Sequence, residues 1–358
     1  MFITYGFNFL TGKSIMGLPL DEILKYYPDE DTVNLIISTS CDKVDDYVKD
    51  PKFFHKYSKV LNKLLPCIRD VSALLENLDK ELYLGDKLSS WRVIISAFKK
   101  GLVDKDFIDS RKNTLSQVLT QAEGWEIILE IIDLVRDKIE ENKKKLYELL
   151  PSHEELWEVV YKGGIAIPSL VLEDPHVKSG SIKSKYFWKF LLTRRKDGTV
   201  KQIVINGLKR GNLTAWYYSL EFVRSGVISE NEIYSNSAVL LNKIRSKSTW
   251  MVITRISPFL EKDLISQYIS IFFERLFEGK IFIKLLKSGI LTSEYREYYL
   301  ELLMFDHRAW VYVDKVVKYN LVSKEELEIF REYFEYFVKV FPDLKRHEKK
   351  IRQVLGWA

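Results

Sequence analysis

The chain has 358 residues, of which 46% are apolar, so it is long enough for two ordinary domains or for one elongated repeat domain with a sizeable core. Its 55 Lys and Arg against 50 Asp and Glu give a formal net charge of +5, which excludes the strong bias of a dedicated nucleic-acid packaging protein. Net charge alone therefore does not indicate a partner.

The cysteines and the apolar runs indicate a soluble, cytoplasmic protein. Cys41 and Cys67 lack the CxxC spacing of zinc or redox sites and are too few to staple a large secreted chain, so a reducing cytoplasm is expected. Residues 1–10 lack the basic start and the cleavage site of a signal peptide, and no run of about 18 uncharged apolar residues occurs, so we expect no membrane association. The composition is typical of proteins from hot environments, because Gln, Met and Cys are few and Lys, Glu, Ile and Tyr are many.

The first 50 residues differ from the rest of the chain. Nine of them are Asp or Glu and four are Lys, which predicts an acidic N-terminal cap over residues 1–50. Within it, Gly6–Ser14 looks like a phosphate loop, but five residues separate its two glycines where that motif has four, and no carboxylate partner follows. We therefore expect no nucleotide site there. Helical patterns at 53–65 and 68–82 follow the cap.

A short phrase recurs along the rest of the chain: a cation, any residue, Gly or Asn, two mostly apolar residues, and a residue type that caps helices. Its clear copies are centred on Gly101, Gly226, Gly289 and Asn320, and its poorer copies on Gly164 and Gly198. The gap from position 101 to 164 equals the gap from 226 to 289, and both are about twice the gap from 289 to 320. The spacing predicts a repeat of about 31 residues.

Tryptophan marks the same period. Seven of the eight Trp residues, with Gly279 in one further place, run from position 91 to position 310 at intervals that average one such repeat. In clear copies the Trp stands ten residues before the Gly or Asn, which fits a helix of nearly three turns ending in a left-handed residue. The cation of the phrase then lies at the negative end of the helix dipole. Because Trp recurs at one helix position, we predict that it packs in the core.

A second helix follows each turn. The residues predicted to cap it are Asp104, Ser229, Thr292 and Ser323. Ser323 and Glu326 also have capping-box spacing. The residues 14 places after the Gly or Asn, which we expect to be buried, are Leu115, Leu240, Leu303 and Phe334. The copy at Gly198 has Asn212 there instead, so the repeat is irregular at this point.

These units predict an all-α fold, because a helix–turn–helix unit cannot bury its apolar face alone and must stack on its neighbours. We expect an α-solenoid of about eight two-helix repeats over residues 51–341, followed by a basic C-terminal helix over residues 342–358. Phrases of tetratricopeptide and ankyrin repeats are absent, and residues 85–340 resemble HEAT-like helical repeats, with shorter units. The resemblance is architectural and implies no active site. Residues 172–184, with Pro and Gly, predict the longest loop.

The strongest functional signal is the segment 183–210, where cations are interleaved with aromatic residues at 186–188 and the only acid is Asp197. Cations beside aromatic rings suit phosphate contacts combined with base stacking. The predicted nucleic-acid-binding residues are Lys183, Lys185, Lys189, Arg194, Arg195, Lys196, Lys201, Lys209 and Arg210. The alternative is that they are ordinary solvated helix faces.

We find no catalytic constellation in the sequence, and expect no metal and no small-molecule cofactor. The five His residues are scattered without metal-ligand spacing, and His307 beside Asp306 is interpreted as a structural pair. The expected function is a noncatalytic scaffold that presents an extended surface to a macromolecular partner, with nucleic acid or another polyanion favoured.

Two other classes stay open. One is a pure protein-protein interaction module, whose binding would survive high salt, whereas polyanion binding would weaken. The other is a HEAT-like enzyme acting on nucleic acid, of the glycosylase type, which would hold a damaged base among Trp residues and a carboxylate. The sequence offers no candidate for that carboxylate.

Overall fold

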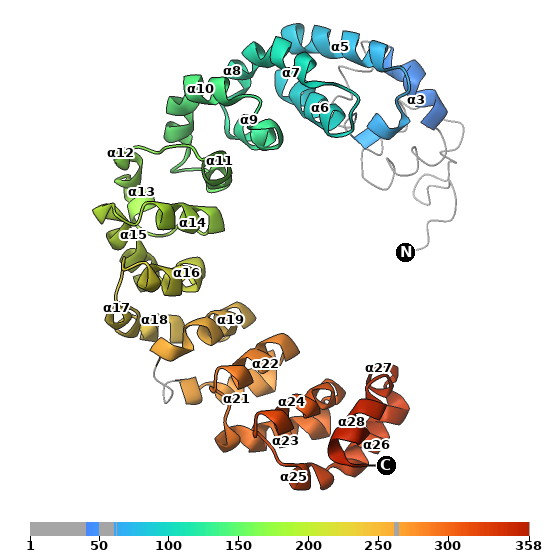
Figure 1. Ribbon diagram of the computed structural model, residues 1–358, viewed down its shortest axis with the longest axis vertical. Helices are drawn as coiled ribbons and strands as arrows, with labels where there is room; N and C mark the ends of the chain where they lie inside the picture. The colour runs from blue at the N-terminus through green and yellow to red at the C-terminus, as the bar shows by residue number, and fades with distance from the viewer. Residues whose placement is uncertain (1–40, 50–60, 62, 261–264, 358) are drawn as a thin grey trace, which may run out of the picture. The chain divides into compact units, whose positions relative to one another are not determined.

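The computed structural model describes residues 41–49, 61, 63–260 and 265–357 (Figure 1). Every regular element in these residues is helical, so the all-α prediction is confirmed for them. None of their helices is long and apolar enough to cross a membrane. Contacts divide the chain into two compact units, Met1–Ile167 and Pro168–Ala358. The phosphate-loop-like segment Gly6–Ser14 and most of the predicted acidic cap lie outside the described residues.

The helices of the N-terminal unit are α3 (Cys41–Val48), α5 (Val71–Leu84), α6 (Lys87–Lys99), α7 (Lys105–Arg111), α8 (Leu115–Val118), α9 (Ala122–Ile127), α10 (Arg136–Leu149) and α11 (Leu156–Gly163). Helix α6 packs against α5 and α9, and α9 packs against α11. The Trp-bearing helices α6, α9 and α11 therefore follow one another in contact.

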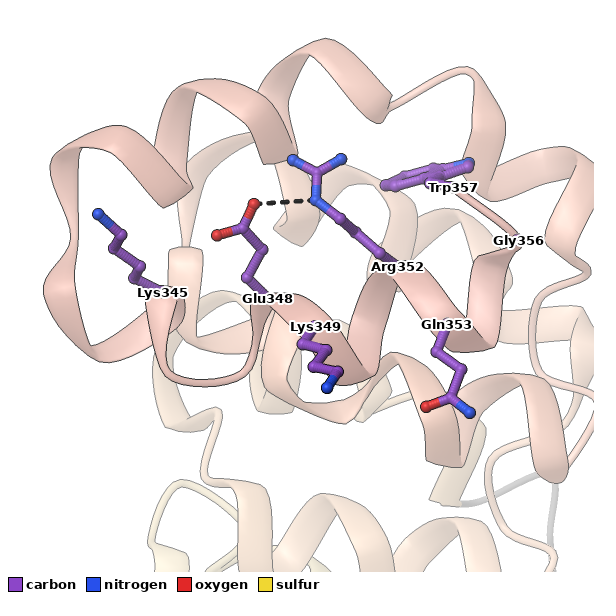
Figure 2. Close-up of a pocket in the computed structure, with 7 residues that line it drawn as sticks. All are labelled: Lys345, Glu348, Lys349, Arg352, Gln353, Gly356 and Trp357. Carbon is purple, nitrogen blue, oxygen red and sulfur yellow. Dashed lines mark hydrogen bonds and ion pairs between the residues drawn. The ribbon is translucent and has the colours of Figure 1, made fainter.

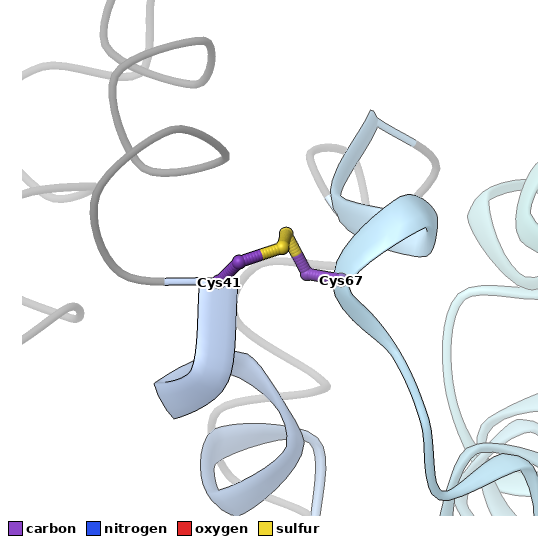
Figure 3. The surroundings of a disulfide bond; sticks show 2 residues. All are labelled: Cys41 and Cys67. Carbon is purple, nitrogen blue, oxygen red and sulfur yellow. A yellow bond between two sulfur atoms is a disulfide. The ribbon is translucent and has the colours of Figure 1, made fainter.

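A disulfide bond closes the start of this unit (Figure 3). It joins Cys41, the first residue of α3, to Cys67 in a short 3₁₀ turn, with the two Cα atoms 4.9 Å apart in space and 26 positions apart in the sequence. The side chain of Asn77 in α5 donates a hydrogen bond of 2.6 Å to the carbonyl of Val48 at the end of α3. Sequence spacing gave no sign of this pairing, because the two cysteines meet only through the fold.

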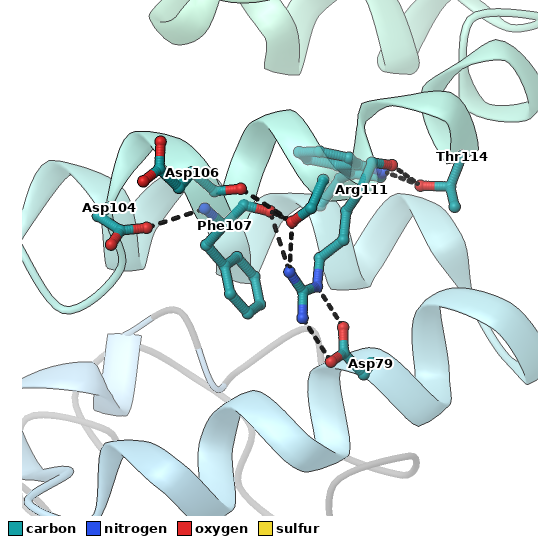
Figure 4. A network of polar contacts seen from close by, with 8 residues as sticks. Asp79, Asp104, Asp106, Phe107, Arg111 and Thr114 are labelled. Atoms are coloured by element: carbon teal, nitrogen blue, oxygen red, sulfur yellow. Dashed lines mark hydrogen bonds and ion pairs between the residues drawn. The ribbon is translucent and has the colours of Figure 1, made fainter.

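A polar network ties α7 to α5 (Figure 4). Arg111 forms a two-pronged ion pair with Asp79, with 2.6 Å from Nη2 to Oδ2, and this hydrogen bonding raises the pKa of the guanidinium. The guanidinium also lies 3.6 Å from the ring centre of Phe107. Next to it, Thr114 Oγ1 accepts a hydrogen bond of 3.0 Å from the Trp91 indole and donates one to the Arg111 carbonyl. The network therefore links three consecutive helices.

The helices of the C-terminal unit are α12 (Ser169–Leu172), α13 (Pro175–Lys178), α14 (Lys185–Thr193), α15 (Gly198–Lys209), α16 (Leu213–Arg224), α17 (Glu230–Tyr234), α18 (Ser237–Leu241), α19 (Lys247–Ile256), α21 (Ile269–Ile271), α22 (Gly279–Lys287), α23 (Arg296–Phe305), α24 (Val313–Lys318), α25 (Lys324–Glu328), α26 (Arg331–Val340), α27 (Pro342–Lys345) and α28 (Glu348–Leu355). Helix α13 interrupts the predicted loop 172–184. The predicted C-terminal helix consists of two short helices, α27 and α28.

Five of the six turn residues of the repeat phrase are left-handed, as the sequence predicts. Their φ angles are 71° at Gly101, 62° at Gly164, 74° at Gly226, 69° at Gly289 and 54° at Asn320. An L side chain is strained at such angles, whereas Gly is not and Asn tolerates them. The residue that ends each of these helices is therefore encoded locally.

The prediction for the sixth copy of the phrase, at Gly198, is wrong. Gly198 is the first residue of α15 and not a turn residue, because Asp197 caps that helix by accepting a hydrogen bond of 3.1 Å from the Thr199 N–H. Thr292 occupies the N-cap position of a 3₁₀ turn, Ser293–Tyr295, but its hydroxyl makes no capping hydrogen bond and is buried without a hydrogen-bond partner in the described residues. The other three predicted caps are confirmed, and the Ser323 cap has its capping box.

The predicted core is confirmed. All seven repeat tryptophans are fully buried, as are the four residues predicted 14 places after the turn. Several indoles also donate a hydrogen bond to a carbonyl in the segment just before their own helix: Trp125 to Leu119 at 2.8 Å, Trp188 to Ile182 at 2.8 Å and Trp216 to Leu208 at 3.1 Å. Each of these Trp residues therefore fills the core and fixes the preceding connection.

Candidate anion-binding face

The structure brings three residues of the predicted basic segment together on α14. Lys185 and Lys189 lie one turn apart, and their ammonium groups are 4.8 Å and 5.8 Å from the ring centre of Tyr186. This is the arrangement of cations and an aromatic ring that the sequence predicted. Trp188 and Phe187, in contrast, are fully buried and face the core.

The other predicted cations do not join this group. Arg194 pairs with Asp197 at 3.3 Å, and Lys201 pairs with Glu232 of α17 at 3.0 Å, so an acid faces each of them. The remaining predicted cations, all exposed, are Lys183 before α14, Arg195 and Lys196 in the turn after it, and Lys209 and Arg210 at the end of α15. The segment 183–210 thus extends over two helices and a turn and does not form one contact group.

A stronger concentration of cations lies on four helices that contact one another in sequence, α14, α16, α19 and α22. They contain one acid, Glu221, and eight cations: Lys185, Lys189, Arg224, Lys247, Arg255, Lys280, Lys284 and Lys287. The helices α17, α23 and α25 in the same unit carry more acids than cations. In Figure 1, α14, α16 and α19 form one row, and α15 and α17 lie on the other side of it. Positive charge is therefore concentrated on one of the two rows.

A shallow groove of about 540 Å³ crosses three helices of this row. Its lining residues are Lys185 of α14, Leu213, Thr214, Tyr217 and Tyr218 of α16, and Ser248, Met251 and Val252 of α19. Lys284 of α22 lies beside it, with its ammonium nitrogen 3.9 Å from the sulfur of Met251. The groove thus combines an apolar and aromatic floor with a cation at each end.

The acid of this row is paired within it. Arg255 forms an ion pair with Glu221, and its guanidinium lies 4.4 Å from the ring centre of Tyr217. The Nε of Arg255 and the Oε2 of Glu221 are buried without a hydrogen-bond partner in the described residues. Glu221 is therefore engaged with Arg255, and the four helices contain no second acid.

Two other hollows have polar groups that are satisfied internally. In one of about 670 Å³ between α13 and α15, Glu173 accepts hydrogen bonds of 2.6 Å from both Lys178 and Thr199, which lower its pKa. The other, of about 610 Å³, lies on α28 (Figure 2). There Arg352 bonds both oxygens of Glu335 at 2.7 Å and also bonds Glu348 at 2.9 Å. In both hollows the carboxylates are therefore engaged by neighbouring side chains, and the exposed Lys345 and Lys349 also line the second one.

The structure adds no catalytic constellation in the residues it describes. No group of three or more His, Cys, Asp or Glu side chains among them could hold a metal ion. The ring of His307 stacks on Phe341 at 3.9 Å, and Asp306 is bonded to Arg308 at 2.6 Å. Both members of the predicted structural pair therefore have packing or ion-pair partners.

Sequence reasoning missed Arg255, Lys284 and Tyr217, because it looked for cations along one segment. The signal was present in the repeat: Arg255, Lys284 and Lys315 all stand five residues after the Trp position, which is 250, 279 or 310. Comparing equivalent positions of successive repeats, and not neighbours in the chain, would have identified this face.

Comparisons with protein-family models, with curated proteins and with solved structures find no match to the chain. The resemblance to HEAT-like repeats therefore stays a prediction from the sequence. Function has to be argued from the residues of the chain itself.

Proposed function

We propose that this protein is a noncatalytic α-solenoid of about eight two-helix repeats that binds a nucleic-acid strand along the face of α14, α16, α19 and α22. The observation that carries the proposal is the charge of these helices, eight cations against one acid, beside a groove with an aromatic and apolar floor. A stack of repeats presents such a face as a continuous track, which suits an extended polymer better than a small ligand.

A single strand fits this face better than a duplex. Tyr217 is 39% exposed in the groove, and Tyr186 lies between two lysines on the adjoining helix. Unpaired bases can stack on such rings while the lysines contact phosphates, whereas the bases of a duplex are already stacked on each other. The expected ligand is therefore single-stranded DNA or RNA, bound with little sequence preference.

The test is a titration of dye-labelled single- and double-stranded DNA and RNA at two salt concentrations, followed by anisotropy. The triple reversal Lys185→Glu, Lys189→Glu, Lys284→Glu should weaken single-strand binding and reduce the slope of log K against log salt by about 0.7 for each phosphate that is no longer neutralised. A matched control is Lys345→Glu, Arg346→Glu, Lys349→Glu, which makes the same charge change on exposed positions of α27 and α28 and the turn between them. Equal effects of both triples, or no binding by the wild type, would contradict the proposal.

A third variant separates this face from the segment predicted from the sequence. Reversing Arg194, Arg195, Lys209 and Arg210 to Glu should abolish polyanion binding if the segment 183–210 is the site. If the row of four helices is the site, this variant should bind more tightly than the Lys185/Lys189/Lys284 reversal, because its residues lie outside the groove.

The two alternative functions receive unequal support. A glycosylase-type enzyme needs accessible aromatic rings to hold an extruded base, but the seven repeat tryptophans have no exposed surface. A protein-interaction module has an observation in its favour, an exposed apolar surface on α23 and α26. That surface is distinct from the basic face and is compatible with it.

A further inference from the structure

Exposed apolar side chains are concentrated near the end of the C-terminal unit. Of the eleven large apolar side chains that are exposed among the described residues, six lie on or beside α23 and α26: Tyr298, Phe305, Ile329, Tyr333, Tyr336 and Val340. Phe305 is 76% exposed and Ile329 is 77% exposed, so these two side chains contact little of the protein. Single exposed apolar residues are ordinary, whereas a contiguous group indicates an interaction surface.

On α26 these residues form one stripe. Tyr333, Tyr336 and Val340 are separated by three and four positions, which puts them on one face of α26, and Ile329 stands two residues before that helix, at the end of α25. A different face of the same helix faces the core through Phe334, Phe337 and Val338. The helix is thus apolar on two faces, and only one of them is used by the fold.

The stripe continues onto α23, which contacts α26. Tyr298 and Phe305 are seven residues apart on α23 and so lie on one face of it. At the C-terminal ends of the two helices, the ring of His307 stacks on Phe341 at 3.9 Å. Phe305 lies two residues before His307 in the chain and Val340 directly before Phe341, so both exposed residues stand at the helix ends that this ring contact joins.

The repeat register shows that the fold does not require apolar residues at these places. Tyr298, Leu302 and Phe305 occupy the same repeat positions as Ile329, Tyr333 and Tyr336 of the following repeat. In the repeat aligned on Leu240, these positions hold Ser235, Val239 and Asn242. In the repeat aligned on Leu115, they hold Ser110, Thr114 and Gln117. Five of those six residues are polar. The apolar surface is therefore particular to the last two repeats.

The exposed charges on the solvent side of the stripe are mostly acidic, and the exception on α26 is Lys339, seven positions after Glu332. Glu301 and Glu332 occupy equivalent repeat positions, are exposed, and make no ion pair in the part of the chain that the structure describes. Both lie on the solvent side of the apolar stripe, with Glu297 one turn before Glu301. An acidic border repels nucleic acid and anionic lipid surfaces and attracts cations. A second copy of the chain would bring the same acidic row against itself.

We propose that α23 and α26 form a docking surface for an amphipathic helical segment of a partner protein, apolar on one face and flanked by Lys or Arg. The part of the surface on α26, Arg331–Val340, is ten residues long, about 15 Å at 1.5 Å per residue, which is close to three turns of a partner helix. The partner's apolar side chains fill the surface, and its cations meet Glu301 and Glu332. This inference does not rest on nucleic-acid binding, which uses other helices.

The test uses a defined probe, a dye-labelled peptide of Leu and Lys with its leucines on one helical face. Two comparison peptides are a scrambled version and a version with Glu in place of Lys. Wild-type protein should bind the Leu/Lys peptide in preference to both. Phe305→Ser with Tyr336→Ser should weaken this binding by about tenfold or more. Leu170→Ser is the matched control, because Leu170 is 82% exposed on α12 and lies outside the stripe.

A charge variant tests the acidic border separately. Glu301→Lys with Glu332→Lys should weaken binding of the Leu/Lys peptide and strengthen that of the Leu/Glu peptide. Equal affinity for the scrambled peptide, or binding unchanged by Phe305→Ser with Tyr336→Ser, would overturn the inference. A wild-type dimer in light scattering that Phe305→Ser with Tyr336→Ser abolishes would also overturn the inference, because the surface would then be occupied by a second copy of the chain. The variant Phe305→Ser with Tyr336→Ser should bind single-stranded nucleic acid as tightly as the wild type, which keeps the two proposals distinguishable.

Discussion

The disulfide between Cys41 and Cys67 should stabilise the N-terminal unit by a predictable amount. A cross-link lowers the entropy of the unfolded chain in proportion to the logarithm of the loop that it closes, and here 26 residues separate the two cysteines. That loop corresponds to about 12 cal/mol/K, or about 3.5 kcal/mol of unfolding free energy near room temperature. The variant Cys41→Ser, Cys67→Ser should lose this amount, and its loss should be confined to the N-terminal unit.

The assay is urea unfolding of the wild type and the double variant, each with and without dithiothreitol. Reductant should destabilise the wild type to the level of the double variant and should leave the variant unchanged. The m value should be somewhat larger without the disulfide, because the unfolded chain without the cross-link is less compact and exposes more surface. Oxidised and reduced wild type unfolding at the same urea concentration would refute the reasoning. So would a thiol titration that finds both cysteines free in protein purified without reductant.

The remaining predictions concern one turn and one ion pair. Gly226→Ala should destabilise the protein by about 1 kcal/mol, because the φ of 74° strains an L residue although no atom lies within 4 Å of the added Cβ. Asn320→Gly, at a φ of 54°, should be neutral or stabilising. Equal melting temperatures for Gly226→Ala and the wild type would contradict the strain argument. The hydrogen bonds from Arg352 hold the pKa of Glu335 below its ordinary value, so the pair contributes stability above about pH 4.3, the unfolded-state pKa, and loses it as pH falls through the folded-state pKa. Glu335→Gln should therefore lower the free energy of unfolding by at most about 1 kcal/mol at neutral pH and leave it unchanged in strong acid. Urea unfolding over a range of pH measures this, and a stability difference that persists in acid would mean that the ion pair is not its cause.

Much of the local structure could be predicted from the sequence because the signals are short-range. A left-handed turn residue such as Gly101 or Gly289 is required by the backbone, and a cap such as Ser323 acts within three residues. The repeat period identified the buried tryptophans, because a residue that recurs at one place in a stacked unit faces the same neighbours each time. These features depend on the chain only over one repeat.

The features that could not be predicted from the sequence depend on distances in space. The pairing of Cys41 with Cys67 requires two segments to meet across 26 residues, and no spacing rule encodes it. Whether the basic segment 183–210 forms one face also depends on the fold, and in the structure Lys201 contacts Glu232 of α17 and Arg194 contacts Asp197. A cationic face built from four helices becomes visible only when equivalent repeat positions are placed side by side. The cytoplasmic location and the origin in a hot environment both stay predictions; disulfides are rare in the cytosol of mesophiles and common inside hyperthermophiles.

The buried tryptophans also make the protein its own optical probe. An indole in an apolar core emits at shorter wavelength than one in water, so seven fully buried rings give a folded protein with a blue-shifted emission band. Because these rings occupy every repeat place from Trp91 to Trp310 except that of Gly279, replacing all Trp residues but one with Phe leaves a chromophore in a chosen repeat. A set of such variants reports where unfolding begins and whether the two compact units melt together. The same residue that fills each layer of the core thus records the loss of that layer.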